Sequence, residues 1–379
     1  MKAVVLTAGE GRRLRPLTER RPKPMLPVAN RPVLEHVVEA LADADVTDLV
    51  FVVGYRRDRI QSYFGDGDDW DVDIEYVVQE RRLGTGHALL QAEDAVDDDY
   101  LVVNGDGFLD SDVLRRLAES AGASIAVTSA DHPGDYGVVD VEDGLVKSIK
   151  EKPGPAAVAE SGVVNAGAYR LDSRVFDELR DVERTPEGEL SLVDVLAARA
   201  RGGSVEAVWT DSWADVSHPW DLVDLNSRRA DGRRVDATVH PTAYVADDVV
   251  LGRDARVGPN ASVLPGTALG DNAVVGAGAV VAGSVVFGDA RVGENAVLRD
   301  AVVGEGADVG PGVVVEGGPA DVVSGDEVHR GVSLGGVVGD GTYVGGGARL
   351  EPGVVLGVDV RVSPGARVGG RVNSGTEVR

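Results

Sequence analysis

Residues 250–281 read VLGRDARVGPNASVLPGTALGDNAVVGAGAVV, and an aliphatic residue recurs at every sixth position from Leu251 to Val281. A repeat of six residues is typical of a parallel β-helix, in which each unit forms one face of a triangular coil. The aliphatic side chain points into the coil, and each coil buries its apolar positions by stacking on the next. The spacing therefore predicts a solenoid in this part of the chain.

The same repeat extends to both sides of this stretch. It begins at Val239, is interrupted near Gly317-Gly318-Pro319 and resumes at Val332. We interpret the interruption as a loop that leaves the prism. Residues 239–379 are therefore predicted to form a β-helix domain, and the charged residues 232–238 are predicted to be a hinge.

The N-terminal half, residues 1–231, has a different periodicity. Short β-branched runs alternate with amphipathic stretches such as 33–41 and 87–95, a pattern typical of βα units around a mainly parallel sheet. The predicted strands are Ala3–Leu6, Leu49–Val53, Ile74–Val78, Leu101–Val103 and Ser124–Thr128. Sheets of this Rossmann-like kind bind ligands beyond the carboxyl ends of their strands. We therefore expect functional residues directly after each strand.

The composition excludes several classes of partner and chemistry. The formal net charge of −25 disfavours binding to nucleic acid or to an anionic membrane. The chain has no cysteine, which excludes disulfides, thiolate zinc sites and cysteine nucleophiles. The first apolar run is too short for a signal peptide or a membrane span, so we expect a cytoplasmic protein. Abundant carboxylates and only five lysines resemble the composition of salt-adapted proteins.

A glycine-rich loop follows the first predicted strand. Residues 6–16 read LTAGEGRRLRP, and residues 21–27 read RPKPMLP. Glycines let backbone N–H groups approach phosphate oxygens, and arginine with lysine neutralises a triphosphate. A dinucleotide-binding fingerprint would need glycine in place of Leu14, and a P-loop would need a lysine directly after a glycine, which this chain lacks. The loop therefore indicates a phosphate site of another kind.

Residues 6–27 resemble the signature of the sugar-1-phosphate nucleotidylyltransferases, the family of glucose-1-phosphate thymidylyltransferase and N-acetylglucosamine-1-phosphate uridylyltransferase. The resemblance implies a nucleotidyl-transfer domain of Rossmann-like α/β fold followed by a left-handed parallel β-helix. It also implies that Arg13 and Lys23 bind the β- and γ-phosphates of the nucleotide and stabilise the departing pyrophosphate. The implied nucleotide contacts in the loop are Leu6, Ala8, Gly9 and Gly11.

Residues 79–88, QERRLGTGHA, match the base-recognition element of that family. The amide of Gln79 offers a donor and an acceptor, which suits the imide edge of uracil or thymine. Gly84 and Thr85 are expected to open a helix whose first N–H groups are free. The two bases differ by a single methyl group, so UTP and dTTP both remain possible substrates. His87 receives no role.

Two acids are expected to hold Mg²⁺. Asp106 follows an apolar strand and stands between two glycines, and Mg²⁺ takes few protein oxygens besides water and substrate phosphates. The resemblance assigns Asp106 to the metal, and it assigns Asp215 in Trp213-Ala214-Asp215-Val216 as the second ligand. The sugar 1-phosphate would then be aligned for attack on the α-phosphorus of the nucleotide.

The sugar site is expected between these two acids in the chain. By resemblance, Lys152 pairs with the sugar phosphate and is a catalytic residue with Arg13 and Lys23. Glu151 and Asn165 take sugar hydroxyls, and Gly137 offers its backbone.

The β-helix leaves further functions open. In the family, such domains assemble trimers or carry an acyltransferase site, so we expect a homo-oligomer and favour a trimer. His329 is a candidate base for acetyl transfer from acetyl-CoA to glucosamine 1-phosphate. Against this, the downstream segment 347–352 lacks the asparagine expected there, which leaves acetyl-CoA unsupported. A catalytically silent subunit that only binds nucleotide sugars is another alternative.

Overall fold

The computed structural model describes residues 1–130, 132–151, 162–185, 188–325 and 327–379. These residues separate into two compact units. The first contains Met1–Glu10, Pro22–Met25 and Val33–Asp215, and the second contains Gly11–Arg21, Leu26–Pro32 and Val216–Arg379. Two short segments of the glycine-rich region therefore belong to the second unit, and the predicted division at residues 231–239 stays a prediction.

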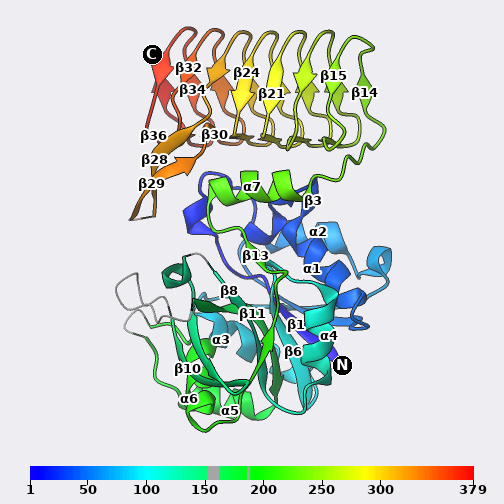
Figure 1. The fold of residues 1–379 in the computed structure, drawn as a ribbon, viewed down its shortest axis with the longest axis vertical. Helices are drawn as coiled ribbons and strands as arrows, with labels where there is room; N and C mark the ends of the chain where they lie inside the picture. Colours follow the sequence, from blue (N-terminus) through cyan, green and yellow to red (C-terminus); the bar gives the residue numbers. More distant parts are fainter. Residues whose placement is uncertain (131, 152–161, 186–187, 326) are drawn as a thin grey trace. The chain divides into compact units, whose positions relative to one another are not determined.

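The first unit is built on a nine-stranded sheet in the order β5-β4-β1-β6-β11-β8-β12-β10-β9. Its centre is parallel: β1 pairs in parallel with both β4 and β6, so that Leu6 is opposite Val52 on one side and Asn104 on the other. The five predicted strands are confirmed as β1 (Lys2–Leu6), β4 (Asp48–Val53), β5 (Asp73–Val78), β6 (Asp99–Asn104) and β8 (Ser124–Ser129). Figure 1 labels β1, β6 and β8 of this sheet.

The sheet is less parallel than the sequence predicts. Strand β11 (Val163–Asp172) runs antiparallel to both β6 and β8, and its register shifts between Asn165 and Tyr169. Three further strands were not predicted: β9 (Val138–Glu142), β10 (Leu145–Lys150) and β12 (Glu206–Trp209). Polar residues interrupt the apolar runs of β9 and β10, and the apolar run of β12 has only three residues, so all three lack the long continuous pattern of a buried parallel strand.

Helices cover both faces of this sheet, because successive strand residues point to opposite sides. One face packs on α1 (Val33–Ala42), α2 (Arg57–Phe64) and α4 (Ser111–Glu119). The other packs on α3 (Thr85–Leu90), α5 (Arg174–Asp181) and α6 (Leu192–Arg201). The helix predicted over 33–41 is confirmed, whereas the stretch 87–95 divides into α3 and a 3-10 turn at Glu93–Ala95. No helix among the described residues is long and apolar enough to cross a membrane.

The second unit contains the predicted left-handed β-helix. Its strands form three all-parallel sheets, and Val239, Val245 and Leu251 pair with Val257, Val263 and Leu269, one coil further on. The inward aliphatic side chains form one continuous core, in which Val263 and Leu269 are fully buried. Figure 1 shows these coils in colours that run from green to red. Helix α7 (Pro219–Arg229) packs against β22 (Val285–Val286) and β25 (Ala301–Val303) of one sheet.

The strands of the three β-helix sheets are short. The first sheet contains β14 (Thr238–Val239), β17 (Arg256–Val257), β20 (Val274–Val275), β23 (Arg291–Val292), β26 (Asp308–Val309), β31 (Tyr343–Val344), β34 (Arg361–Val362) and β37 (Glu377–Val378). The second contains β15 (Tyr244–Val245), β18 (Ser262–Val263), β21 (Val280–Ala282), β24 (Val297–Arg299), β27 (Val314–Val315), β32 (Arg349–Leu350) and β35 (Arg367–Val368). The third contains β16 (Val250–Leu251), β19 (Ala268–Leu269), β22, β25, β30 (Gly336–Val338), β33 (Val354–Leu356) and β36 (Arg371–Val372).

The interruption of the repeat is an antiparallel hairpin, not an irregular loop. Strand β28 (Pro319–Ser324) pairs with β29 (Glu327–Ser333), and Val332 lies opposite Ala320 within it. Val332 is therefore not a repeat position, and the prediction that the coils resume there is wrong. They resume at β30, which pairs with β25 and continues the third sheet.

Candidate active site

The carboxyl ends of four strands of the first unit meet at one edge of the sheet. The Thr7 N–H donates to the Val52 carbonyl (3.0 Å), and the Gly105 N–H donates to the Leu6 carbonyl (3.0 Å). The Gln79 N–H donates to the Val53 carbonyl (2.8 Å). These bonds extend the ladder beyond β1, β4, β5 and β6, and they bring the residues after each strand together, as the topology of an α/β sheet requires.

The start of the glycine-rich loop lies at this edge. Ala8 is buried, and a Cβ on Gly54, just after β4, would come within 3.0 Å of the Ala8 Cβ. Gly9 is exposed, and a Cβ built on it would meet no atom within 4 Å. Glu10 forms an ion pair with Arg82. The backbone at Gly9 is therefore open to a ligand, while Gly54, for which no role is predicted, makes room for Ala8.

Gly11 and Arg13 belong to the second unit, where they lie at the start of a 3-10 turn, Arg12–Leu14. Gly11 has a φ of 63°, a left-handed conformation that suits glycine, and its carbonyl accepts a hydrogen bond from Thr18 Oγ1 (2.8 Å). The Arg13 carbonyl accepts a hydrogen bond from Ser324 Oγ at the end of β28 (3.0 Å). The backbone at Arg13 is thus fixed to the hairpin.

Lys23 lies between the two acids that the sequence singled out. Its Nζ is 2.8 Å from Asp106 Oδ2 and 2.9 Å from Asp215 Oδ1. The acids meet because β7 (Gly107–Phe108) pairs with β13 (Ala214–Asp215), which sets Asp215 opposite Gly107. Side-chain exposures of 12% for Lys23 and 15% for Asp215 make this a largely buried cluster.

The opposite charges of Lys23 and the two acids stabilise one another. Burial alone would lower the pKa of Lys23, but the attraction of Asp106 and Asp215 and their hydrogen bonds outweigh it and raise that pKa. Lys23 is therefore a cation at any physiological pH. One cation and two carboxylates carry a net negative charge, which leaves the cluster able to attract a further cation.

The donor set fits Mg²⁺. That ion binds one or two carboxylates at about 2.0–2.1 Å and completes its shell with water and substrate phosphates. Asp106 and Asp215 each have an oxygen within 2.9 Å of the same atom, so both can reach one small ion. Within the described part of the chain, no group of three or more His, Asp or Glu could enclose a metal on its own. Such an ion would therefore need ligands from a substrate.

The residues predicted to recognise the base form a compact group at the end of β5. Gln79 is 5% exposed, and its Nε2 lies 3.1 Å from the Gly84 carbonyl and 3.0 Å from His87 Nδ1. Gly84 has a φ of 95°, and a Cβ there would collide with the Leu190 carbonyl at 2.4 Å. Thr85 Oγ1 accepts a hydrogen bond from the N–H of Leu192, the first residue of α6 (3.2 Å).

The first turn of α3 differs from the expectation in one respect. The Gly86 N–H donates to the Leu190 carbonyl (2.8 Å), so at least one early N–H of this helix is already bonded. His87 is the residue at this edge that sequence reasoning left without a role. The signal that could have found it is its place within one helical turn of Gly84.

Three of the four predicted sugar-site residues lie together. A Cβ on Gly137 would be 3.1 Å from Glu151 Oε2 and 3.6 Å from the Asn165 Cβ. The Asn165 side chain donates to Tyr169 Oη (2.7 Å) and accepts from the Gly167 N–H (2.9 Å), so it is held firmly in place. Lys152, the fourth residue, lies outside the described residues.

His329 lies on the hairpin of the second unit. Its ring centroid is 4.5 Å from that of His218 and 5.0 Å from that of Trp220. His218 in turn stacks on Trp220, with centroids 4.4 Å apart. His329 is therefore one member of an aromatic cluster between the hairpin and α7.

Comparison with known proteins shows what the two parts of the chain resemble. The nucleotidyl transferase family matches residues 2–232, and the GMPPB C-terminal domain matches residues 235–335. The chain is 38% identical over 231 residues to the bifunctional protein GlmU of Methanococcus maripaludis, which covers 60% of this chain and 54% of that protein. It is 34% identical over 261 residues to the low-salt glycan biosynthesis nucleotidyltransferase Agl11 of Haloferax volcanii, covering 66% of this chain and 71% of Agl11.

Two further comparisons point the same way. The glucose-1-phosphate thymidylyltransferase of Streptomyces antibioticus is 31% identical over 267 residues, which are 68% of this chain and 74% of that enzyme. A solved structure from Bacillus anthracis, described as a glucose-1-phosphate thymidylyltransferase in complex with a sucrose, has a TM-score of 0.55 and 28% identity; it covers 60% of this chain and 94% of that one. The chain spans about half the length of the GlmU proteins it matches. Because the nucleotidyl transferase family matches residues 2–232, more than half of the chain, the chain belongs to that family.

Proposed function

We propose that this protein transfers a nucleotidyl group from UTP or dTTP to a sugar 1-phosphate, giving a nucleotide sugar and pyrophosphate. The observation that carries the proposal is Lys23 held within 2.9 Å of both Asp106 and Asp215 at the carboxyl edge of the sheet. A permanent cation beside two carboxylates suits a reaction between two phosphate groups. The two negatively charged groups must approach each other, and the charge that develops on the leaving group must be stabilised.

The chemistry requires alignment and charge stabilisation. An oxygen of the sugar phosphate attacks the α-phosphorus and pyrophosphate leaves; the attacking phosphate is already ionised near neutral pH, so the protein needs no general base. Lys23, with Arg13 from the signature, stabilises the charge that develops on pyrophosphate. Mg²⁺ held by Asp106 and Asp215 would neutralise phosphate charge and orient the reacting groups.

The nucleotide and sugar would contact separate groups of residues. Leu6, Ala8, Gly9 and Gly11 would present backbone to the nucleotide, and Gln79 with Gly84 and Thr85 would recognise its base. Glu151, Asn165 and the backbone of Gly137 would receive the sugar, with Lys152 on its phosphate. The close grouping of Gly137, Glu151 and Asn165 supports this assignment.

The β-helix supports the proposal that several copies of this chain assemble. Stacked coils present long flat sheets, and we propose a homo-oligomer, with a trimer favoured, in a cytoplasmic, salt-adapted protein. An acetyl transfer by His329 remains the alternative for a bifunctional chain. The packing of His329 against His218 and Trp220 favours a structural role for its ring over that of a base. A silent nucleotide-sugar-binding subunit is disfavoured because Lys23, Asp106 and Asp215 are all in place.

A screen of pyrophosphate release tests the proposal. Purified protein is incubated with Mg²⁺ and a grid of nucleoside triphosphates and sugar 1-phosphates, at low and high salt. We expect release only when UTP or dTTP is combined with a sugar 1-phosphate, and none from Asp106→Asn. The absence of release from every pair would refute the proposal. Release of free thiol from acetyl-CoA with glucosamine 1-phosphate would instead support the acetyltransferase alternative.

A further inference from the structure

The orientation of the Gln79 amide is fixed by its neighbours. The side-chain atom assigned as Nε2 lies 3.1 Å from the Gly84 carbonyl oxygen, which is only an acceptor. The amide nitrogen must face that oxygen, because the opposite orientation would set two acceptors against each other. Gln79 is 5% exposed, so solvent offers little compensation for the wrong orientation.

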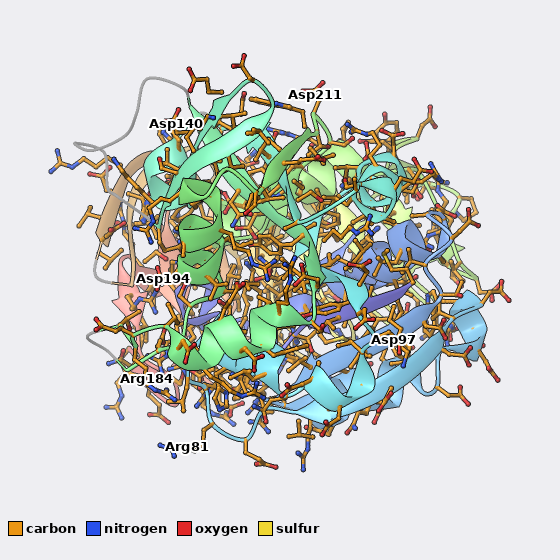
Figure 2. The ribbon with its side chains drawn as sticks, turned by 90° about the horizontal axis from the view of Figure 1, so that it is seen from below. Arg81, Asp97, Asp140, Arg184, Asp194 and Asp211 are labelled. Carbon is orange, nitrogen blue, oxygen red and sulfur yellow. The ribbon has the colours of Figure 1, made fainter. Side chains whose placement is uncertain are left out.

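This orientation determines the state of His87. The Gln79 amide nitrogen also lies 3.0 Å from His87 Nδ1, and it can only donate there. Nδ1 must therefore carry a lone pair, which places the proton of the neutral ring on Nε2. The pKa of His87 is lowered, first by burial and then by the positive charges of Arg184 and Arg81, both labelled in Figure 2. The ring is thus neutral near pH 7 and accepts the bond.

The two hydrogen bonds leave one hydrogen-bonding group of the Gln79 amide for a ligand. Both amide hydrogens are used, one by Gly84 and one by His87, so Oε1 is the group left for a ligand. An isolated acceptor is complementary to the N3–H of uracil or thymine. Cytosine has an unprotonated N3, an acceptor, and would be repelled. A glutamine free to rotate its amide could present its NH₂ to cytosine instead.

We propose that His87 is a positioning residue that holds the Gln79 amide with its oxygen toward the base, so that the site selects uracil or thymine over cytosine. This inference rests on the proposed nucleotidyl transfer and adds to it the source of base selectivity. His87 acts through Gln79 and needs no contact with the nucleotide.

Two variants separate positioning from a general structural effect. His87→Ala removes the acceptor, whereas His87→Asn retains one, because the asparagine Oδ1 can take the place of Nδ1. With His87→Ala we expect the ratio of kcat/KM for UTP or dTTP to that for CTP to fall by about tenfold or more, mainly through KM. His87→Asn should keep a ratio close to that of the wild type. Thermal melts identify a variant that fails to fold.

The pH dependence gives a second readout. Arg81 and Arg184 lower the pKa of His87, and below that lowered pKa the ring gains a proton on Nδ1, which would face the Gln79 NH₂. For the wild type we expect the KM for UTP or dTTP to rise as the pH falls from about 8 to about 5, with kcat less affected. In His87→Asn this rise should be smaller than in the wild type, since the asparagine does not titrate and only the phosphates of the substrates still do.

The results distinguish this inference from the proposed function. If the wild type releases no pyrophosphate from any nucleotide, the proposed function fails, and Kd values for UTP and CTP then replace kcat/KM in the comparison. If the wild type prefers UTP or dTTP and His87→Ala keeps that preference unchanged, the positioning role of His87 is refuted. Equal loss of selectivity in His87→Ala and in folded His87→Asn would also refute it.

Discussion

Replacing Lys23 by methionine removes the cation between the two carboxylates and keeps a side chain of similar length. Lys23 is 12% exposed, and its Nζ bonds Asp106 and Asp215 at 2.8 and 2.9 Å. Breaking a buried ion pair costs about 3–5 kcal/mol. Because the Asp106 side chain is 34% exposed, solvent screens part of that cost, and we expect a loss of about 2–3 kcal/mol in the free energy of unfolding.

Calorimetry measures this loss. In a domain of about 200 residues, each kcal/mol lowers the Tm by about 2–4 °C, so the variant should melt about 4–12 °C below the wild type. Lys147→Met is the matched control, because Lys147 is half-exposed and lies 4.0 Å from Glu142; its change should stay within about 0.5 kcal/mol.

The same variant also tests the proposed metal site. Without Lys23, the two carboxylates have lost their shared cation, so Mg²⁺ should raise the Tm of Lys23→Met more than that of the wild type. A ligand at a hundred times its Kd contributes about 2.7 kcal/mol, which is comparable to the loss itself. A variant that melts with the wild type, or that responds to Mg²⁺ no more than the wild type does, would refute this reasoning.

Three further perturbations have defined outcomes. Gly167 and Gly144 both have a φ near +77°, but only a Cβ at Gly167 would collide with a neighbouring side chain, at 2.5 Å. In urea titrations, Gly167→Ala should therefore lower the free energy of unfolding by about 1–3 kcal/mol more than Gly144→Ala does. Arg21→Met, which removes a guanidinium bonded at 2.8 Å to two acids of the β-helix, should cost about 3–5 kcal/mol in calorimetry, against about 0–1 kcal/mol for exposed Arg20→Met. EDTA should abolish pyrophosphate release until Mg²⁺ is added back. Asp106→Asn should lower turnover by orders of magnitude and leave the far-UV circular dichroism spectrum unchanged. Activity in EDTA, or a fully active variant, would count against the metal site.

The β-helix could be predicted from the sequence because its period encodes burial directly. Val263 and Leu269 follow the stride of six, and both are completely buried. Where the period stops, this signal stops as well. Val332 satisfies the stride by coincidence and belongs to a hairpin, whose pairing depends on Ala320 across the turn and not on spacing along the chain.

The site could be predicted only in part, for a similar reason. Local motifs identified Lys23, Asp106 and Asp215, but their meeting point depends on the pairing of β7 with β13, which no local pattern encodes. The roles of Arg21 and His87 depend entirely on partners brought close by folding. The sequence places Arg21 in the predicted phosphate loop, yet in the structure its buried guanidinium pairs with Asp340 and Glu305 of the second unit.

The fate of the oxygen atoms in the reaction decides whether this family member performs nucleotidyl transfer. Sugar 1-phosphate labelled with ¹⁸O on its phosphate oxygens is incubated with the protein, Mg²⁺ and UTP or dTTP. The masses of the products are then measured by mass spectrometry. Attack of the sugar phosphate on the α-phosphorus predicts that all of the label stays in the nucleotide sugar and that pyrophosphate is unlabelled. Label in pyrophosphate, or recovery of the sugar phosphate without any nucleotide sugar, would contradict the mechanism.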